Sequence, residues 1–574
     1  MDRTAWIVVI LCVVGLVLWE WWLQKQNPAR LRPATVTGSP TPALSIAGVS
    51  PSPSPISPPA VSPTPQPAPS VAAFAEKTET LRNSDVELHL TNHGGGIRDA
   101  VLMHHVAEGD KPVTLNSPQE TPIGAIVDQP ANPALDEFTI ARDPDGSVKC
   151  ERTADNLTVR KKFFFMPSAE KQDNFLVEMD VDFANAGSQP YSNTGYYVAL
   201  GSAVPIHARD YPYYTRVVWC IDGKARDKNV SWFSGGSGFF GMGQRAPQTF
   251  YDEHTAPAEW AAVTDQFFAT LIAPLSVKAD GVWGRRLDIT PDQKMSGIDG
   301  AMHMPGFQLQ PGQAYSARFE VYAGPKIYHR LAQLEHNEAE IMNFGVFKLV
   351  SQFLLNFMNL LHRVLWNSYA AAILALTIII RSVLWPLQSK ANRSMRQTAL
   401  LGPKMQELRE KYKDDPTKMN QEVMKLYKQY GINPVGGCLP MMIQIPIFFG
   451  LYQMLAQAVE LRNAKFLWVH DLSQPDTVAH LPLPGVSIPI NIIPLCMAVT
   501  QLWLMQMTPK TGDATQRRVM MFTPLIFLFF CYNFAAALAL YYTTQNLFSI
   551  LQFYLNKKQP MPKLEKVTPP GKRK

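Results

Sequence analysis

The sequence predicts a multi-domain membrane protein, in which an α-helical polytopic bundle of six transmembrane helices is joined to a large all-β domain. Two observations carry this prediction. Apolar runs cluster before residue 24 and after residue 343 of the 574-residue chain, whereas the region between them alternates apolar and polar residues. A helix of about 20 apolar residues crosses a hydrocarbon core of roughly 30 Å, and strict alternation is typical of half-buried strands.

The first apolar segment, residues 1–26, is interpreted as an uncleaved transmembrane anchor. A cleaved signal peptide is the alternative, but Trp19, Trp21 and Trp22 stand where small residues would precede a cleavage site. Tryptophan also suits the membrane interface. Residues 27–72 contain 13 prolines and no acidic residue, so they are expected to be an extended, polyproline-like linker.

Residues 73–335 show the period-two pattern of β-strands. In the stretch FLVEMDVDF, apolar residues alternate with acidic ones, and similar runs are separated by Gly, Asn and Pro. We predict one large antiparallel β-sandwich. Polar side chains such as Asp252 and His254 show no spacing that indicates a metal or catalytic site. Cys150 and Cys220 could pair if the domain is exported.

After the β-domain the apolar pattern becomes helical. Residues 343–367 carry one polar stripe, which favours an amphipathic helix in the membrane interface; a true crossing is the alternative. The spans predicted after it are residues 369–387, 435–459, 487–507, 519–534 and 535–556. The last two belong to one long apolar stretch, about 55 Å as a single helix. It exceeds one crossing, so we expect a turn near residues 532–536.

Basic residues set the expected orientation. Residues 390–428 hold ten Lys or Arg against five acids, residues 508–518 hold three against one, and the tail 557–574 holds seven against one. Basic flanks stay in the cytoplasm, so these segments and both termini are expected there. The β-domain follows the first span and is therefore expected outside, which in a bacterium is the periplasm.

The basic loop 388–434 is predicted to form a cytoplasmic helical hairpin from residues 391–413 and 416–430. Its charged face is either solvated or docks a partner. The net charge of +6 is concentrated in segments that flank the membrane, and no basic region rich in aromatic residues points to direct sequence-specific binding of nucleic acid. No cofactor, metal or catalytic residue is expected.

Arg381 is the only charged residue of the span 369–387. A charge in such a helix is unfavourable by at least ~2.5 kcal/mol on insertion scales. Its side chain leans toward the helix N-terminus, away from the cytoplasmic surface, and none of the four later spans offers an acid to pair with it. We therefore predict a cationic, water-accessible polar cavity open to the cytoplasm. Its expected lining is Thr377, Gln388, Gln444, Gln501, Tyr541, Gln545, Ser549 and Gln552.

Four stretches, TIIIRSVLWPL, INPVGGCLPMMIQIPIFFGLY, VELR and WVHDLS, resemble motifs of the bacterial YidC membrane protein insertases. The resemblance implies an insertase and chaperone of the inner membrane, not an enzyme, that receives nascent membrane proteins from the ribosome, alone or beside the Sec translocon. It implies that Arg381 lies in a hydrophilic groove near Thr377, Gln444, Tyr541 and Tyr542. It also implies a periplasmic domain like a β-supersandwich, similar to sugar-binding folds.

One feature departs from that family, which usually separates the last two spans with a Pro and a Gly. The junction here reads YNFAAALAL, and alanine favours helix. Two other classes of protein remain alternatives. A polytopic transporter should carry a charged coupling pair between spans, and a membrane-tethered periplasmic carbohydrate-binding protein or enzyme should carry paired carboxylates in the β-domain; neither pattern is evident.

Overall fold

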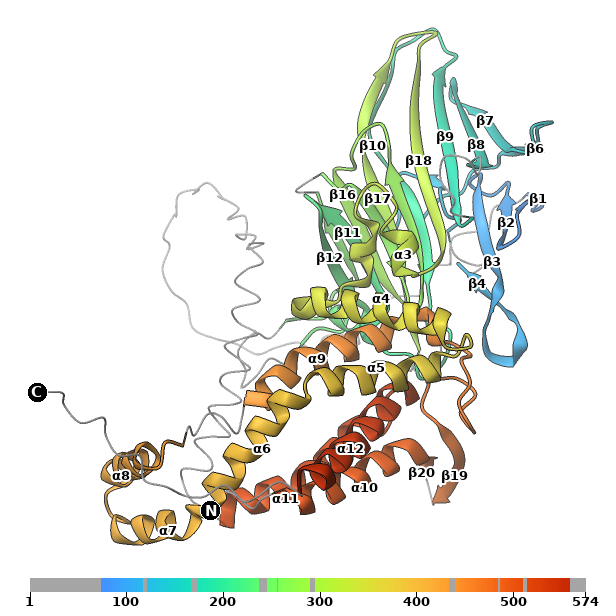
Figure 1. The fold of residues 1–574 in the computed structure, drawn as a ribbon. Helices are drawn as coiled ribbons and strands as arrows, with labels where there is room; N and C mark the ends of the chain where they lie inside the picture. Colours follow the sequence, from blue (N-terminus) through green and yellow to red (C-terminus); the bar gives the residue numbers. More distant parts are fainter. Residues whose placement is uncertain are drawn as a thin grey trace, which may run out of the picture. The chain divides into compact units, whose positions relative to one another are not determined.

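The structure is a computed structural model, and it describes residues 74–116, 121–166, 174–236, 245–254, 257–289, 295–432, 439–483, 486–508 and 514–557. One compact unit of the chain comprises Phe74–Gly512 and Met520–Lys574. It contains a β-domain followed by helices (Figure 1). The anchor and linker predicted at residues 1–72, and the basic tail from residue 558 onward, lie outside the described residues.

The β-domain consists of three sheets in which all described neighbouring strands are antiparallel. The four-stranded sheet runs in the order β1 (Thr78–Arg82), β2 (Val86–Thr91), β3 (Gly96–Val106) and β4 (Pro112–Leu115). The five-stranded sheet runs β13 (Phe250–Glu253), β16 (Gly281–Asp288), β17 (Ser296–Leu309), β10 (Tyr191–Ala203) and β5 (Ile126–Val127). The nine-stranded sheet runs β12 (Lys224–Asn229), β11 (Arg216–Ile221), β14 (Trp260–Thr264), β15 (Phe268–Pro274), β18 (Ala314–Pro325), β9 (Leu176–Asn185), β8 (Leu157–Phe165), β7 (Val148–Ala154) and β6 (Thr139–Arg142).

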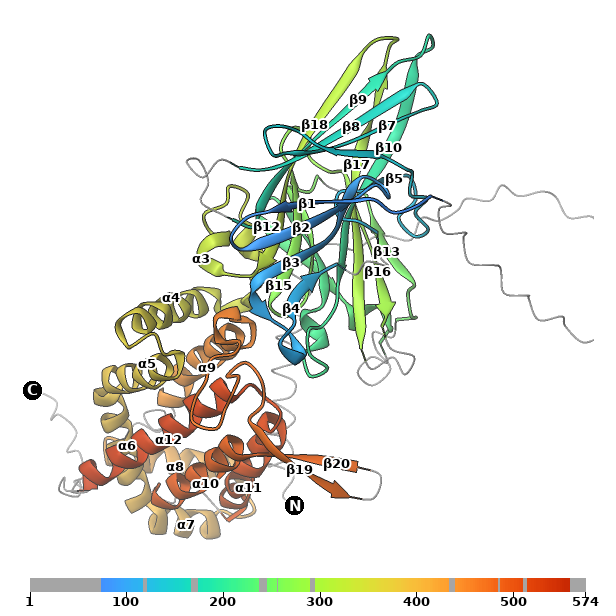
Figure 2. The same ribbon diagram turned by 90° about the vertical axis from the view of Figure 1, so that its right-hand side faces the viewer.

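The five- and nine-stranded sheets pack face to face, so the predicted antiparallel β-sandwich is confirmed. A Cβ at Gly300 on β17 would lie 2.8 Å from Val263 on β14, and one at Gly284 on β16 would lie 2.9 Å from Val217 on β11. These glycines let the two layers approach closely. The additional four-stranded sheet, drawn in blue, crosses in front of the longer strands in Figure 2.

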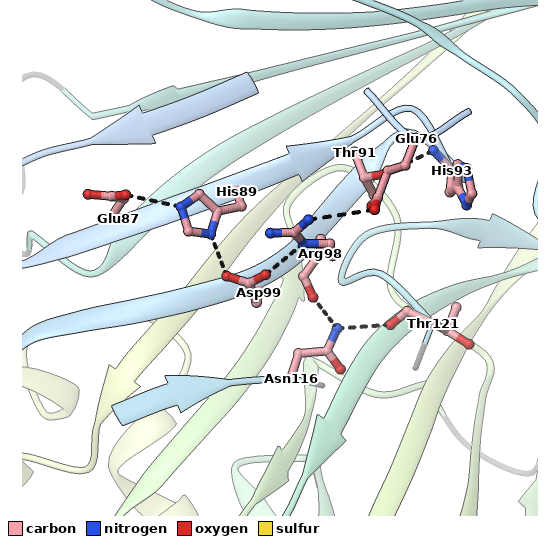
Figure 3. A network of polar contacts seen from close by, with 9 residues as sticks. All are labelled: Glu76, Glu87, His89, Thr91, His93, Arg98, Asp99, Asn116 and Thr121. Atoms are coloured by element: carbon pink, nitrogen blue, oxygen red, sulfur yellow. Dashed lines mark hydrogen bonds and ion pairs between the residues drawn. The ribbon is translucent and has the colours of Figure 1, made fainter. Parts of the chain in front are cut away.

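Polar side chains link the strands of this four-stranded sheet (Figure 3). Asp99 on β3 is 3% exposed and lies between two cationic or titratable partners. One of its oxygens accepts from Arg98 Nε (2.7 Å), and the other lies 2.6 Å from His89 Nδ1. The second ring nitrogen of His89 lies 3.0 Å from Glu87. Because both oxygens of the buried Asp99 carboxylate have partners, the sheet avoids the cost of an isolated buried charge at this position.

Cys150 on β7 and Cys220 on β11 are both buried and free. Five strands of the nine-stranded sheet separate β11 from β7. At about 4.8 Å per strand, this places the two residues roughly 29 Å apart, far beyond the Cα separation that a disulfide can span. The possible pairing left open by the sequence is therefore not formed.

Lys161 on β8 is fully buried in the β-domain. Its Nζ donates hydrogen bonds to the carbonyl oxygens of Gly94 (2.8 Å) and Gly124 (2.9 Å). Burial lowers the pKa of this amine to about 7, because removal from water disfavours the charged form. A neutral amine still carries two hydrogens, which suffice for both carbonyls.

We expect Lys161→Met to lower the free energy of unfolding, by an amount that grows as the pH rises from about 7 to about 9. Each buried carbonyl left without a donor costs about 1–3 kcal/mol. Between the folded pKa of about 7 and the ordinary value of 10.5, the unfolded wild-type chain binds more protons than the folded chain. The free energy of unfolding of the wild-type chain therefore increases with pH in this window, whereas the methionine variant lacks this contribution. Unfolding of both chains across the window measures the difference, and a pH-independent difference would contradict the expectation.

Helices make up most of the second half of the chain. They are α4 (Lys348–Val364), α5 (Tyr369–Val383), α6 (Trp385–Leu400), α7 (Gly402–Lys411), α8 (Pro416–Gln429), α9 (Leu439–Gln457), α10 (Ile492–Met507), α11 (Ala514–Cys531) and α12 (Ala536–Lys557). Among the described residues, no helix alone has the length and apolarity of a crossing. In the described part of the chain, only a pair of helices has them in combination: Gly345–Val364 and Tyr369–Val383, which are bent by 120° relative to each other. Two further apolar helices there are shorter, Ile492–Met507 and Met521–Cys531.

Several element boundaries differ from the sequence prediction. The span predicted at residues 369–387 ends at Val383, and the helix predicted from residue 519 begins at Ala514. The single helix predicted at residues 391–413 is divided between α6 and α7, because Pro403 in the first turn of α7 has no N–H for a helix continuing from α6. The span predicted at residues 487–507 is helical only from Ile492. Its first residues form β20 (Val486–Asn491), which pairs with β19 (Thr477–Leu483) in a hairpin that the sequence analysis did not predict.

The last two helices are separated at residues 532–535, although no proline or glycine stands there. The start of α12 is held from outside, because the Ala536 N–H donates to the carbonyl of Gln474 (2.8 Å). The end of α11 is held in the same way, since Asn491 Nδ2 donates to the carbonyl of Tyr532 (2.7 Å). Contacts with a distant loop thus replace a helix-breaking residue.

Candidate polar site among helices α5, α9 and α12

Thr377 and Arg381 lie one turn apart on α5, so they share one face of the helix. Thr377 is fully buried, and its hydroxyl donates to the carbonyl of Ile373 (2.7 Å). Arg381 lies in the last turn of α5 and is partly buried. The helix ends just after it, since Pro386 occupies the first turn of α6. The arginine is therefore placed at a break between two helices.

Three polar side chains on α9 and α12 form a hydrogen-bonded group beside α5. Gln444 Nε2 of α9 donates to Gln545 Oε1 (3.1 Å) and to the Tyr541 hydroxyl (3.4 Å), both on α12. Tyr541 is 1% exposed and Gln545 is 8% exposed. Arg381 interacts electrostatically with Tyr541 and with its neighbour Tyr542. The structure thus brings these side chains together from three helices that are distant in sequence.

Arg381 is a cation without an acidic partner among the described residues. No Asp or Glu occurs in α5, α9, α10 or α12, and the groups that act electrostatically on Arg381 are the two tyrosines of α12. Tyr542 in turn packs its ring near Phe448 (5.5 Å between centroids) and Phe527 (5.7 Å). An arginine is always charged, so it requires solvation by water or by an anionic group that enters the site.

Two of the predicted site residues make no hydrogen bond to this group among the described residues. Gln388 is on α6, beyond the helix break, and donates to Asn392 Oδ1 of the same helix (3.3 Å). Gln501 is on α10, and its Oε1 is buried without a partner among the described residues. The polar contact between α10 and α12 is made instead by Asn546, which donates to Thr500 Oγ1 (3.2 Å).

A further polar group lies between α6 and α12. Asn556 Nδ2 donates to Ser389 Oγ (3.4 Å), and Arg396 donates to the carbonyl of Asn556 (3.3 Å). Asn392 Nδ2 and both polar atoms of the Gln552 side chain are buried without a partner in the described structure. Buried amides normally have partners, so these atoms mark a place for water or a polar ligand. Asn392 and Asn556 were not among the predicted site residues, although each lies one helical turn after a predicted one, Gln388 and Gln552.

Hydrogen bonds also join the β-domain to the end of α9. Gln266 Nε2 donates to the carbonyl of Ala456 (2.8 Å). Arg462, in the sequence VELR, donates to the carbonyl of Val106 on β3 (2.8 Å), and its guanidinium lies 5.0 Å from the centre of the Phe268 ring. This part of the VELR sequence therefore has a structural role, because it attaches the helices to the β-domain.

An all-β domain followed by apolar helices, with an arginine that has no acidic partner among the described residues, is typical of a membrane protein with a large domain outside the bilayer. The family model for the YidC periplasmic domain matches residues 79–357, and the model for the 60Kd inner membrane protein matches residues 360–563. The chain belongs to the YidC family of membrane protein insertases, as its motifs predicted.

Individual relatives cover nearly the whole chain. The membrane protein insertase YidC of Nitratidesulfovibrio vulgaris is 30% identical over 584 residues, which span 96% of this chain and 98% of the relative. That of Chlorobaculum tepidum is 29% identical over 582 residues, 97% of this chain and 95% of the relative. A crystal structure of an active YidC insertase aligns over 85% of this chain and 94% of its own, with 18% identity and a TM-score of 0.34.

Proposed function

We propose that this protein inserts newly made membrane proteins into the bacterial inner membrane and assists their folding, without catalysing a covalent reaction. The observation that carries this proposal is the similarity to an insertase at 30% identity over nearly the full length of both chains. The polar group around Arg381, Gln444, Tyr541 and Gln545 would line a hydrophilic groove that receives the polar part of the substrate.

In the proposed topology the chain crosses the membrane six times, with both termini in the cytoplasm and the β-domain in the periplasm. The distribution of Lys and Arg supports this orientation. Helix α4 would lie in the membrane interface. Its exposed apolar side chains share one face, as their helical spacing requires, and α4 bends by 120° from α5. These side chains are Leu349, Phe353, Leu360 and Val364.

The proposed mechanism divides the substrate between two surfaces. Its hydrophilic segment enters the groove, drawn by the charge of Arg381, so that the polar path across the bilayer is shorter. Its apolar segment passes along the exposed faces of α9 and α12 into lipid. Those faces carry Met442, Ile445, Phe449, Leu547, Leu551 and Leu555. The driving free energy comes from the burial of the substrate's own apolar helix, about 25 cal/mol per Å² removed from water.

The proposed partners are nascent membrane proteins, membrane lipids, the Sec translocon for some substrates, and the ribosome. The basic helices α7 and α8 support contact with the ribosome: their exposed Lys and Arg side chains are suited to its phosphate backbone, and such contacts depend on charge rather than on sequence. Lys411, Lys413, Lys418 and Lys425 stand in or beside these helices.

Depletion of the protein should block insertion of a small single-span substrate. The measurement is protease protection of a pulse-labelled substrate whose translocated segment is short, followed in depleted cells and in depleted cells that express the wild-type chain from a plasmid. We expect the translocated segment to become accessible to external protease only where the protein is present. A soluble exported protein, followed in the same cells, controls for a general loss of secretion. Normal translocation of the small substrate in depleted cells would refute the proposal.

A further inference from the structure

Histidine and aspartate side chains from separate strands meet on one face of the five-stranded sheet. His303 lies on β17, Asp280 directly precedes β16, and His254 directly follows β13. Tyr197 on β10 is the register partner of His303, and their ring centres are 4.7 Å apart. This cluster is outside the polar helical site described above, and nothing in the insertase mechanism uses it.

The donor atoms of this cluster are close enough to share a metal ion. One ligand atom from each of His254, Asp280 and His303 lies within 4.8 Å of the other two. A tetrahedral Zn²⁺ ion with bonds of 2.0–2.1 Å holds its ligand atoms about 3.4 Å apart, so small side-chain rotations would bring the three atoms to one ion. Two imidazoles and one carboxylate also form a common zinc ligand set, with the fourth position left open.

Two glycines provide the space that the imidazoles occupy. A Cβ at Gly281 would lie 2.6 Å from His254 Nδ1, and a Cβ at Gly195 would clash with His303 Nε2. Gly281 is the register partner of His303 and the neighbour of Asp280. His254 Nδ1 therefore lies above the backbone position that adjoins both of the other ligands.

The second nitrogen of His254 is held by other side chains. Asp252 Oδ1 lies 2.9 Å from His254 Nε2, and the Tyr197 hydroxyl lies 3.3 Å from the same nitrogen. A carboxylate on the far nitrogen of an imidazole fixes its orientation and tautomer in metal sites, which leaves Nδ1 for the ion. Asp280 already contacts His303 Nδ1, and the Asp280 side chain is 49% exposed, so an ion can enter from solvent.

We propose that His254, His303 and Asp280 bind a divalent transition-metal ion of the Zn²⁺ class, with Asp252 as a positioning residue. Imidazole ligands select such ions over Mg²⁺ and Ca²⁺, which prefer oxygen. Strand β13 is the edge strand of its sheet, so the ion would fasten this edge to β16 and β17. Binding would therefore stabilise the β-domain.

The test uses the full-length chain in detergent, purified with a tag that contains no histidine and freed of metal with a chelator. Titration with Co²⁺ should give the visible absorption of a tetrahedral site at one ion per chain, and competition with Zn²⁺ should remove it. Asp280→Asn and His254→Ala should each weaken binding at least about tenfold. Gly281→Ala should do the same without removing a ligand, because its methyl group would displace His254. His104→Ala, which removes an exposed histidine 3.8 Å from Asp85, is the matched control.

Zinc should also raise the thermal unfolding temperature of the wild-type and His104→Ala chains, but not that of Asp280→Asn. Circular dichroism verifies that each variant is folded. If His254→Ala unfolds, the metal affinity of Asp280→Asn, which changes an exposed side chain, is the result that tests the proposal. The proposal would be overturned if the wild-type chain bound no Co²⁺, or if Asp280→Asn bound it as tightly as the wild-type chain. The proposal would also be overturned if His104→Ala weakened Co²⁺ binding as much as Asp280→Asn does.

Discussion

Replacement of Arg381 by alanine should reduce the insertion of substrates with acidic translocated segments about tenfold, and should leave substrates with neutral segments nearly unaffected. The arginine has no acidic partner among the described residues of the helices, so its charge is available to an incoming carboxylate. A tenfold change corresponds to ~1.4 kcal/mol. Two unit charges roughly 10 Å apart interact by about that much at an effective dielectric constant near 20.

The measurement compares two substrates that differ only in two aspartates or two asparagines within the translocated segment. Both are pulse-labelled and scored by protease protection in cells that contain only the variant insertase. Arg381→Lys retains the positive charge and should retain most of the discrimination. Ile379→Ala changes an exposed apolar residue of the same helix and serves as the control. An equal defect for both substrates would show that Arg381 acts by packing rather than by charge.

The polar site was predictable where it depends on local periodicity. Thr377 and Arg381, and likewise Tyr541 and Gln545, are four residues apart, so each pair must share a helix face whatever the tertiary structure. The proximity of Gln444 depends on how α9 packs against α12, which no local pattern encodes. Its place in the predicted site came from the scarcity of polar residues in apolar spans.

Among the described residues, neither Gln388 nor Gln501 hydrogen-bonds to the group around Arg381, so their place in the groove stays a prediction. Gln388 is seven residues after Arg381 and would share its face in a continuous helix, but the break at Leu384 starts a new helix before it. Gln501 was expected from its polarity alone. The polar contact between α10 and α12 is made instead by the residue before it, Thr500, which accepts a hydrogen bond from Asn546.

The β-domain shows the same division between local and long-range information. Alternating residues predicted antiparallel strands, and the sandwich is confirmed. Sheet order was not predictable, because β10 pairs with β17 across about a hundred residues of sequence. The cluster of His254, Asp280 and His303 is brought together by the pairing of β16 with β13 and with β17, so its ligands have no recognisable spacing along the chain.

The junction between the last two helices is also held by contacts that are distant in sequence. Apolar length and flanking charge predicted a turn near residues 532–536, while the alanines that follow favour helix. The structure has its break there because Gln474 and Asn491, both in the segment between α9 and α10, bind the ends of the two helices. Sequence could place the turn but could not reveal what holds it.

The most direct test of the central claim is the rate at which a charged, membrane-impermeant maleimide labels single cysteines in inverted membrane vesicles. Arg381→Cys and Gln545→Cys would each be made in a chain whose six native cysteines are replaced, with Ile379→Cys, at an exposed apolar position of the same helix as Arg381, as the control. Water that reaches the polar group from the cytoplasmic side predicts labelling at 381 and 545 at least about ten times faster than at 379. If positions 381 and 545 were as unreactive as 379, the arginine would not lie in a water-accessible groove, and the proposed route for substrate segments would be wrong.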